Sequence, residues 1–238
     1  MFVGSYANAA VISDTDFLAG NWTAQDLFAN NGAAGTAVQM IAGGNPDAYR
    51  FMTHTMPGPV SLMVPATNLW IYHEFQGASY DPSVSGAIAS VNYSEDQRQF
   101  NPPFAGAAIG ARAAIEQAGV VYVSSTHINY NHVGSWQTAV LPGLAAADFI
   151  DFASFGFAGG DDMFDNPDFS PTGSVIRFGF VRANTTGTVG VLQVTEHGID
   201  NWSYTTNAAR VPEPATLTLF GLGLLGLGVV RRRKRNTA

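Results

Sequence analysis

The sequence predicts an all-β fold, an antiparallel two-sheet β-sandwich of the jelly-roll kind, with a single transmembrane helix at the C-terminus. Three observations support this prediction. Short apolar runs of strand length recur along residues 9–205, with glycine, proline, asparagine and threonine between them. No long segment has the apolar spacing of an amphipathic helix. One apolar run of 16 residues, 215–230, stands apart near the end of the chain.

Twelve runs have the length and composition of β-strands, and clusters of Gly, Pro, Asn and Asp bound many of them. In chain order, we expect strands at Ala9–Ser13, Ala37–Ile41, Ala48–His54, Asn68–Phe75, Gly86–Tyr93, Ala107–Ala114, Val120–Ile128, Ser135–Val140, Phe149–Ala158, Ser174–Arg182, Val189–Val194 and Ile199–Thr205. Only Thr23–Ala29 and Leu144–Asp148 have a helical composition.

The chain divides into five parts. Ala7-Asn8-Ala9 has the small-x-small pattern of a signal-peptidase site, so we expect residues 1–9 to be the remnant of a signal peptide whose start lies upstream. The other expected parts are the sandwich ectodomain at 10–208, a linker at 209–214, the transmembrane helix at 215–230 and a basic cytoplasmic tail at 231–238.

The ectodomain has no cysteine and a strong negative charge. Without cysteine it has no disulfide, no zinc–thiolate site and no thiol nucleophile, so its stability rests on packing and bound ions. Residues 1–210 contain six arginines, no lysine and 17 acidic residues, which gives a net charge of −11. Such a surface repels nucleic acid and attracts cations, calcium included.

The apolar run near the C-terminus is just long enough for a membrane span. A helix of this length covers roughly 24 Å, a little less than the hydrocarbon core of about 30 Å. Long basic side chains reach toward lipid headgroups, so a short helix can still cross with its basic end in the cytoplasm. That end is formed by Arg231, Arg232, Arg233, Lys234 and Arg235.

The tripeptide Pro212-Glu213-Pro214, the apolar run and the terminal arginine cluster occur in that order. The stretch resembles the PEP-CTERM sorting signal of Gram-negative bacteria, a tail also named after the C-terminal domain of ice-binding proteins. The resemblance implies an inner-membrane exosortase that recognises the tripeptide, cuts near it and passes the ectodomain to the cell surface or extracellular matrix, in exopolysaccharide- or biofilm-producing species. The alternative is an ordinary single-pass anchor that is never processed.

The ectodomain is similar to jelly rolls of the laminin-B and carbohydrate-binding-module kind in three stretches: "GGNPDAYR", "DFSPTGSVIRFGFVRANTTG" and "GIDNWSYTT". Related domains have a Gly-Asn-Pro-Gly turn, in which the last glycine corresponds to Asp47 here. The resemblance implies the fold and says little about function.

Calcium is the expected cofactor, as a structural ion. Asp14, Asp16, Asn45, Asp47 and Asp200 would converge if the first and last strands are neighbours, and hard oxygen ligands suit calcium. The alternative is that Asn45 and Asp47 form an Asx turn while the aspartates lie at strand ends.

A second acidic cluster contains Asp161, Asp162, Asp165 and Asp168. Its spacing differs from that of an EF-hand loop, so we expect a solvated acidic loop in preference to a second calcium site.

Aromatic rings offer apolar area to the C–H face of a pyranose. The candidates are Trp22, Trp70, Trp136, Trp202, Tyr80, Tyr130 and Tyr204, although most tryptophans in a sandwich belong to its core. The best candidate for a binding loop is Asn129-Tyr130-Asn131-His132, whose amides can bond sugar hydroxyls.

We expect no enzyme. A glycosidase needs two carboxylates that flank one bond, and none of the four glutamates ahead of the tail lies in a recognisable pair. Neither a zincin motif nor Gly-x-Ser-x-Gly is present. The expected function is binding of polysaccharide at the cell surface. The alternatives are a structural or adhesive matrix protein without a small ligand and, more distantly, a polysaccharide hydrolase.

Overall fold

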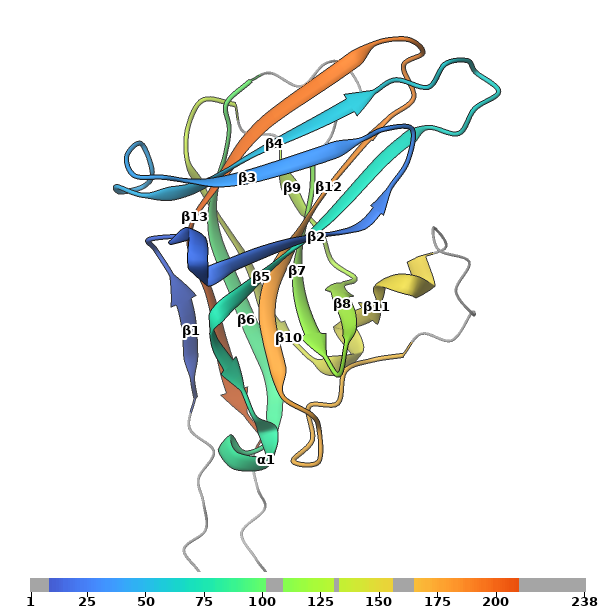
Figure 1. Ribbon diagram of the computed structural model, residues 1–238. Helices are drawn as coiled ribbons and strands as arrows, with labels where there is room; N and C mark the ends of the chain where they lie inside the picture. Colours follow the sequence, from blue (N-terminus) through green and yellow to red (C-terminus); the bar gives the residue numbers. More distant parts are fainter. Residues whose placement is uncertain (1–8, 102–108, 131–132, 156–164, 210–238) are drawn as a thin grey trace, which may run out of the picture.

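The computed structural model describes residues 9–101, 109–130, 133–155 and 165–209, which form two packed β-sheets (Figure 1). The predicted two-sheet sandwich is therefore confirmed, and every pair of named strands is antiparallel. The predicted residues Asn131, His132, Asp161 and Asp162 lie outside the described residues. So do the tripeptide, the predicted transmembrane helix and the basic cluster.

The first sheet has strand order β10-β6-β13-β4-β3, and β1 also pairs with β13. Its strands are β1 (Val11–Asp14), β3 (Ala34–Met40), β4 (Tyr49–Pro57), β6 (Ile88–Gln99), β10 (Gln137–Leu144) and β13 (Leu192–Ala208). With 17 residues, β13 runs the length of the molecule, so β4 pairs with its first half and β1 with its second (Figure 1).

The second sheet has strand order β11-β8-β7-β12-β5-β2, and β9 also pairs with β7. Its strands are β2 (Trp22–Ala29), β5 (Thr67–Tyr80), β7 (Ile109–Gln117), β8 (Val120–Ser124), β9 (Ile128–Tyr130), β11 (Phe149–Asp151) and β12 (Ile176–Thr186). The helical elements are short: α1 (Pro82–Ser85) and the 3-10 turns Ala19–Asn21, Ala146–Asp148 and Phe152–Phe155.

The core between the sheets is rich in aromatic side chains. Trp22 packs on Trp202 with ring centroids 4.9 Å apart, and Phe75, Phe180 and Tyr204 complete the group. Each ring removes about 150–250 Å² from water, which gives a domain without disulfides its main stabilising term.

The two described ends of the chain lie together at one end of the sandwich. The Thr206 amide donates to the Ala10 carbonyl at 2.8 Å, beside the last pairs of β13. In β12, Ile176 pairs with Tyr80 at this end, and Thr186 pairs with Thr67 at the far end. The described chain therefore ends at Ala209, opposite the β4–β5 and β12–β13 loops (Figure 1).

The helical prediction for Thr23–Ala29 was wrong, because these residues belong to strand β2. Trp22 pairs with Phe75 and Ala29 with Leu69, so the hydrogen bonds to β5 override the helix-forming composition of Ala, Gln and Leu. The predicted helix at Leu144–Asp148 is only a 3-10 turn over its last three residues.

Four strand predictions need correction. The predicted strands Val189–Val194 and Ile199–Thr205 fall in one strand, β13, although residues 189–191 lie in the loop before it. Val120–Ile128 splits into β8 and the start of β9. The strand that begins at Phe149 ends at Asp151, where a 3-10 turn replaces it.

Within the described residues, no helix is both long and apolar enough to cross a membrane.

Candidate functional site

A pocket of about 370 Å³ opens on the outer face of the second sheet, above strands β5, β7 and β12. Its lining comes from Trp70, Gly110, Arg112, His127, Ala183, Asn184, Thr185 and Gly187. The volume lies within the range of small-molecule sites, roughly 300–1,000 Å³.

The floor of the pocket is built from small residues on adjacent strands. Gly110 of β7 pairs with Ala183 of β12. A methyl group added at Gly110 would meet only Ala183, with the Cβ at 3.6 Å and the carbonyl oxygen at 3.8 Å. The sheet is therefore open to a ligand at this point, because neither strand projects a large side chain above it.

Trp70 forms an aromatic wall beside this floor. Its ring packs on Phe152 with centroids 5.5 Å apart, and the Arg112 guanidinium carbon lies 5.9 Å from the indole centroid. Arg112 Nη1 also donates to the carbonyls of Ser124 and Ser125, the latter at 2.8 Å. Two independent contacts thus fix the guanidinium against the indole.

Arg112 keeps its charge in this position. Burial lowers its pKa from the ordinary value, yet a guanidinium titrates far above neutral pH, so it stays a cation and a hydrogen-bond donor. The pocket therefore combines an apolar ring with a fixed positive group.

Polar groups surround the aromatic wall. The Thr185 hydroxyl donates to Asn68 Oδ1 at 2.7 Å, and Asn68 Nδ2 donates to the Ala66 carbonyl at 2.9 Å. His127 is exposed on another part of the lining. The Thr185 hydroxyl and the His127 imidazole are thus the side-chain polar groups of the lining that can contact a ligand with hydroxyl groups.

The predicted binding loop begins at the edge of this pocket. Strand β9 pairs with β7 so that Asn129 lies opposite Gly110 and Tyr130 opposite Ile109. The backbone of Asn129 is therefore next to the pocket floor. Sequence reasoning missed Arg112 and His127, although an arginine within the apolar strand "AIGARAAI" was a signal for the first.

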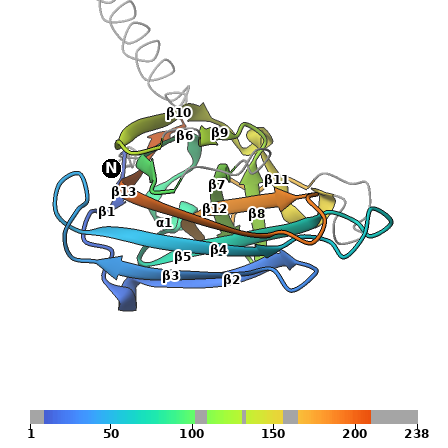
Figure 2. The same ribbon diagram turned by 90° about the horizontal axis from the view of Figure 1, so that it is seen from above.

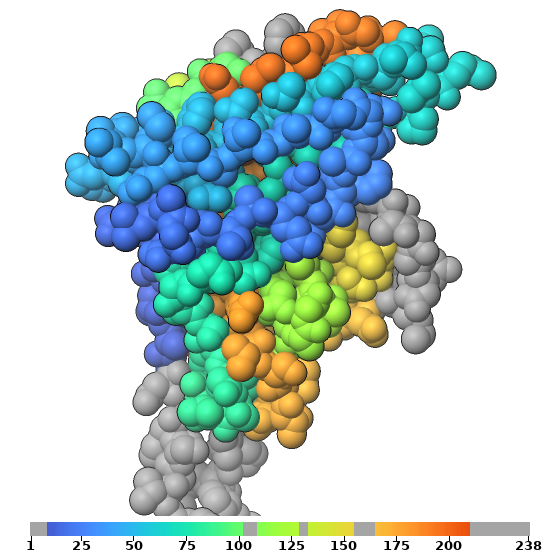
Figure 3. Space-filling view, viewed as in Figure 1, coloured from blue at the N-terminus to red at the C-terminus, as the bar shows by residue number. Residues whose placement is uncertain are grey.

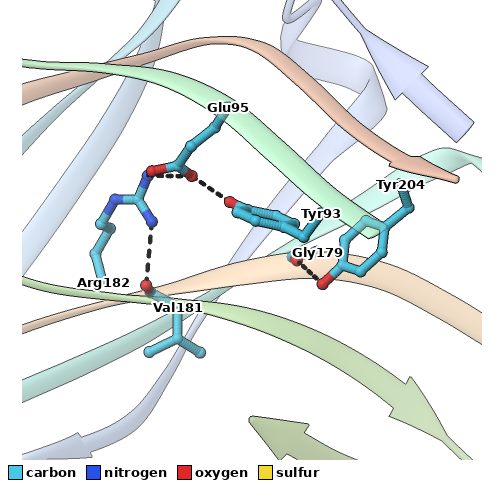
Figure 4. A network of polar contacts seen from close by, with 6 residues as sticks. All are labelled: Tyr93, Glu95, Gly179, Val181, Arg182 and Tyr204. Carbon is cyan, nitrogen blue, oxygen red and sulfur yellow. Dashed lines mark hydrogen bonds and ion pairs between the residues drawn. The ribbon is translucent and has the colours of Figure 1, made fainter. Parts of the chain in front are cut away.

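Most other aromatic candidates belong to the core, as is usual for tryptophans in a β-sandwich. Trp22, Trp202, Tyr80 and Tyr204 are buried. The Tyr204 hydroxyl, for example, contacts the Ala114 carbonyl at 3.0 Å. It also contacts the Gly179 carbonyl at 3.1 Å (Figure 4).

Trp136 lies on the outer face of the other sheet. Its ring contacts Tyr49 and Phe100 with centroids 5.3 and 6.2 Å apart, and its Nε1 donates to the Gly43 carbonyl at 3.1 Å. These rings pack above Gly198, so the space that this glycine leaves is filled.

A buried ion pair lies beneath the pocket floor (Figure 4). Arg182 Nη2 donates to both carboxylate oxygens of Glu95, at 2.8 and 2.7 Å, and both side chains are fully buried. The Tyr93 hydroxyl donates to the same carboxylate. Because a buried charge is stable only when it is paired and hydrogen-bonded, this network fixes strand β12 beneath the pocket.

Three buried histidines belong to the same polar layer. His54 Nδ1 contacts Asn184 Oδ1, and its ring lies 4.7 Å from that of His197. His73 stacks on Phe180 and contacts Arg50. Burial lowers the pKa of His54 to about 4 and the pKa values of His73 and His197 well below their ordinary range, so all three are neutral at neutral pH.

The predicted calcium ligands separate into two groups. The Asp14 carboxylate accepts hydrogen bonds from the Asp16 amide at 2.8 Å and from Trp22 Nε1 at 2.7 Å, so it organises the turn after β1. Asp200 instead accepts from the Asn45 amide. The structure thus brings Asn45 and Asp200 together, whereas Asp14 ends β1 and Asp16 lies in the turn after it.

A further carboxylate, Asp96, joins Asn45 and Asp200. Asp96 Oδ2 accepts from Asn45 Nδ2 at 3.0 Å and from Asn201 Nδ2 at 2.7 Å. Burial raises the pKa of Asp200, and the negative charges of Asp96 and Asp47 add to this effect. Asp47 itself has φ of 65°, a left-handed conformation that suits the glycine of the related turn.

The donor set is suitable for a hard cation but is incomplete. Asp96 and Asp200 are buried, and within the described part of the chain neither forms an ion pair. Across those same residues, however, no three His, Cys, Asp or Glu side chains are grouped so as to hold a metal ion.

In the second acidic cluster, the Asp168 carboxylate accepts a hydrogen bond from the Ser170 amide at 2.8 Å.

Comparison with known proteins places this domain before a sorting signal. Residues 210–234 match the family described as the PEP-CTERM protein-sorting motif. The motif indicates export and sorting to the surface of a bacterial cell. No curated protein matches the chain.

Among the solved structures to which this chain is similar, two are carbohydrate-binding modules. One is the family 11 module of Clostridium thermocellum in complex with a β-1,3-1,4-mixed-linked tetrasaccharide, at 10% identity over 84% of this chain and 96% of that one, with a TM-score of 0.44. Another is the CBM22-1 xylan-binding domain of Paenibacillus barcinonensis Xyn10C, at 9% identity over 87% of this chain and 100% of that one, with a TM-score of 0.40.

Proposed function

We propose that this protein is an exported surface or matrix protein that binds polysaccharide in the pocket beside Trp70. The observation that supports this proposal most strongly is the Trp70 indole, which stands beside the pocket floor of Gly110 and Ala183. Arg112 is fixed next to the indole. A pyranose ring presents C–H groups to an aromatic face and hydroxyl groups at its edge, which suits an apolar wall ringed by polar groups.

Binding is favoured over hydrolysis by the chemistry of the lining. The eight residues that line the pocket include neither aspartate nor glutamate. Glycoside hydrolysis in most families requires a pair of carboxylic acids on either side of the bond. The groups of the pocket can therefore hold a sugar but lack the usual acid–base pair.

The route to the surface follows from the tail. We propose that a Gram-negative inner-membrane exosortase recognises Pro212-Glu213-Pro214 after the helix at 215–230 has inserted transiently in that membrane. Because the described chain ends lie at one end of the sandwich and Thr185 at the other, attachment through the tail leaves the pocket accessible.

Calcium is proposed as a structural ion at the site formed by Asn45, Asp96 and Asp200. Two buried carboxylates without a basic partner in the described residues leave negative charge that a cation would neutralise. The side-chain and carbonyl oxygens of Asn45 are further hard donors at this site.

An array of purified polysaccharides, probed with the full-length protein in calcium buffer, tests the proposed function. We expect selective and saturable binding that a soluble oligosaccharide of the same linkage displaces. If the protein binds no polysaccharide of the array and light scattering shows concentration-dependent self-association, the result would support the structural or adhesive matrix protein instead.

A further inference from the structure

Two loops form the end of the sandwich that is farthest from the chain termini. The first, residues 58–66, connects β4 to β5, and the second, residues 187–191, connects β12 to β13. Figure 2 shows them on the same side of the molecule, and Figure 3 shows the β4–β5 loop projecting beyond the surface around it. We call the two loops, with Leu192, the apolar tip.

The apolar tip exposes an unusual share of large hydrophobic side chains. It holds six of the fifteen exposed large hydrophobic residues of the described chain: Val60, Leu62, Met63, Val189, Val191 and Leu192. Leu62 and Met63 are 89% and 93% exposed. Single exposed apolar residues are common, but a group of this kind on a monomer marks an interaction site.

The tip contains no charged residue. Neither "GPVSLMVPA" (58–66) nor "GTVGV" (187–191) includes Asp, Glu, Lys or Arg, although the domain as a whole carries a large negative charge. Entry into an apolar phase therefore does not require removal of a charge from water, the most costly part of such a transfer.

Hydrogen bonds hold the tip in its projecting shape. The Gly58 amide donates to the Val191 carbonyl at 2.8 Å and the Gly190 amide to the Pro59 carbonyl at 3.0 Å, so each loop supports the other. At the base, Asn31 Nδ2 donates to the Pro65 carbonyl at 3.0 Å. These bonds fix the backbone at the base of the two loops, and the side chains of Leu62 and Met63 are exposed beyond it.

We propose that the apolar tip inserts into the surface of a lipid bilayer. A narrow convex projection has little area for a flat protein contact, whereas a fluid apolar phase closes around it. The negative charge of the domain favours membranes of zwitterionic lipid over anionic ones.

Membrane insertion would bring the pocket close to the headgroups. Thr185 and Gly187 line the pocket and lead directly into the second loop. This inference does not depend on polysaccharide binding, because its test uses vesicles without sugar.

The absence of cysteine permits a site-specific test on the full-length protein. The Leu62→Cys variant, labelled with an environment-sensitive fluorophore, is mixed with phosphatidylcholine vesicles. We expect a blue shift of emission and quenching by brominated lipid. A matched Ser85→Cys label on α1, at the opposite end of the sandwich, should show neither effect.

The label reports the position of the tip even if the C-terminal tail also binds the vesicles. In the Leu62→Cys background, the additional changes Val60→Asp and Met63→Asp should remove at least roughly nine-tenths of the blue shift, since each places a charge in the apolar phase. Val84→Asp is the control, because Val84 is 81% exposed on α1.

Two results would overturn the proposal. One is a label at residue 62 that keeps its aqueous emission and escapes lipid quenching at saturating vesicle concentration. The other is a blue shift that rises with protein concentration without vesicles, which would identify the tip as a contact between copies of this chain.

Discussion

Two strand glycines, Gly198 and Gly110, have opposite surroundings on the outer faces of the two sheets. Above Gly198 of β13, an added methyl group would meet the rings of Trp136, Tyr49 and Phe100 at 2.9–3.0 Å. Above Gly110 of β7, it would meet only Ala183, at 3.6 Å or more. The first space is filled by aromatic rings and the second forms the pocket.

The comparison shows why a tryptophan alone does not identify a sugar site. Trp136 and Trp70 both lie on outer faces, but the Trp136 ring covers a glycine and is part of the packing. Trp70 stands beside an uncovered glycine, so its ring can face a ligand. What distinguishes the faces is whether aromatic side chains occupy the space above a strand glycine.

Acid should have the largest effect, because the buried histidines lie in the interior that both faces share. The pKa of His54 is about 4 in the folded protein and about 6.5 when unfolded, so the unfolded chain binds more protons between these values. Stability is then complete above about pH 6.5 and falls as the pH drops toward 4. The loss from His54 alone is about 3 kcal/mol, and His73 and His197 add to it.

Urea unfolding between pH 4 and 8 measures this effect. A His54→Gln variant should lose part of the pH dependence over the same range. If the free energy of unfolding of the native protein stays constant from pH 7 to pH 4, the histidines are not buried and neutral as described.

Calcium should stabilise the side of the first sheet that carries Gly43, Asn45 and Trp136. A ligand at 100 times its Kd adds about 2.7 kcal/mol, so a chelator should lower the Tm by several degrees. Asp200→Asn should remove the calcium response. The affinity of the pocket for polysaccharide should change little in this variant. If a chelator leaves the Tm of the native protein unchanged, calcium is not bound at this site.

The two glycines themselves provide a matched pair of substitutions. Gly198→Ala should destabilise the domain by about 1–3 kcal/mol, because three rings must move. Gly110→Ala should change stability by less than about 0.5 kcal/mol yet weaken polysaccharide binding, since its methyl group occupies the pocket floor. Thermal melts and binding titrations of both variants measure the difference. Equal destabilisation by both would contradict the contrast between the filled and open faces.

Much of the fold could be predicted because turn residues and apolar runs are local signals. They located most strands, and they failed at Thr23–Ala29, where pairing with β5 overrides local composition. The length of β13 was also missed, since its polar central residues, including His197 and Asp200, are buried and its middle does not alternate as a half-exposed strand would.

Less of the candidate site could be predicted. Trp70 was one of seven aromatic candidates, and nothing local separates it from Trp136. The pocket depends on strand order, which places Gly110 and Arg112 of β7 beside β12 and Trp70 on the next strand. Such pairings join residues tens of positions apart, and spacing along the sequence does not encode them.

The central claim is that polysaccharide binds above Gly110, which is uncovered, and not above Gly198, which aromatic rings cover. The most direct test titrates Trp70→Ala and Trp136→Ala, both as folded full-length protein, with the polysaccharide that the native chain selects. Loss of a stacking ring should cost about 1.4 kcal/mol, so Trp70→Ala should bind roughly tenfold more weakly. Trp136→Ala should melt at a lower temperature and keep its affinity. Full affinity in Trp70→Ala, or a loss confined to Trp136→Ala, would contradict the claim.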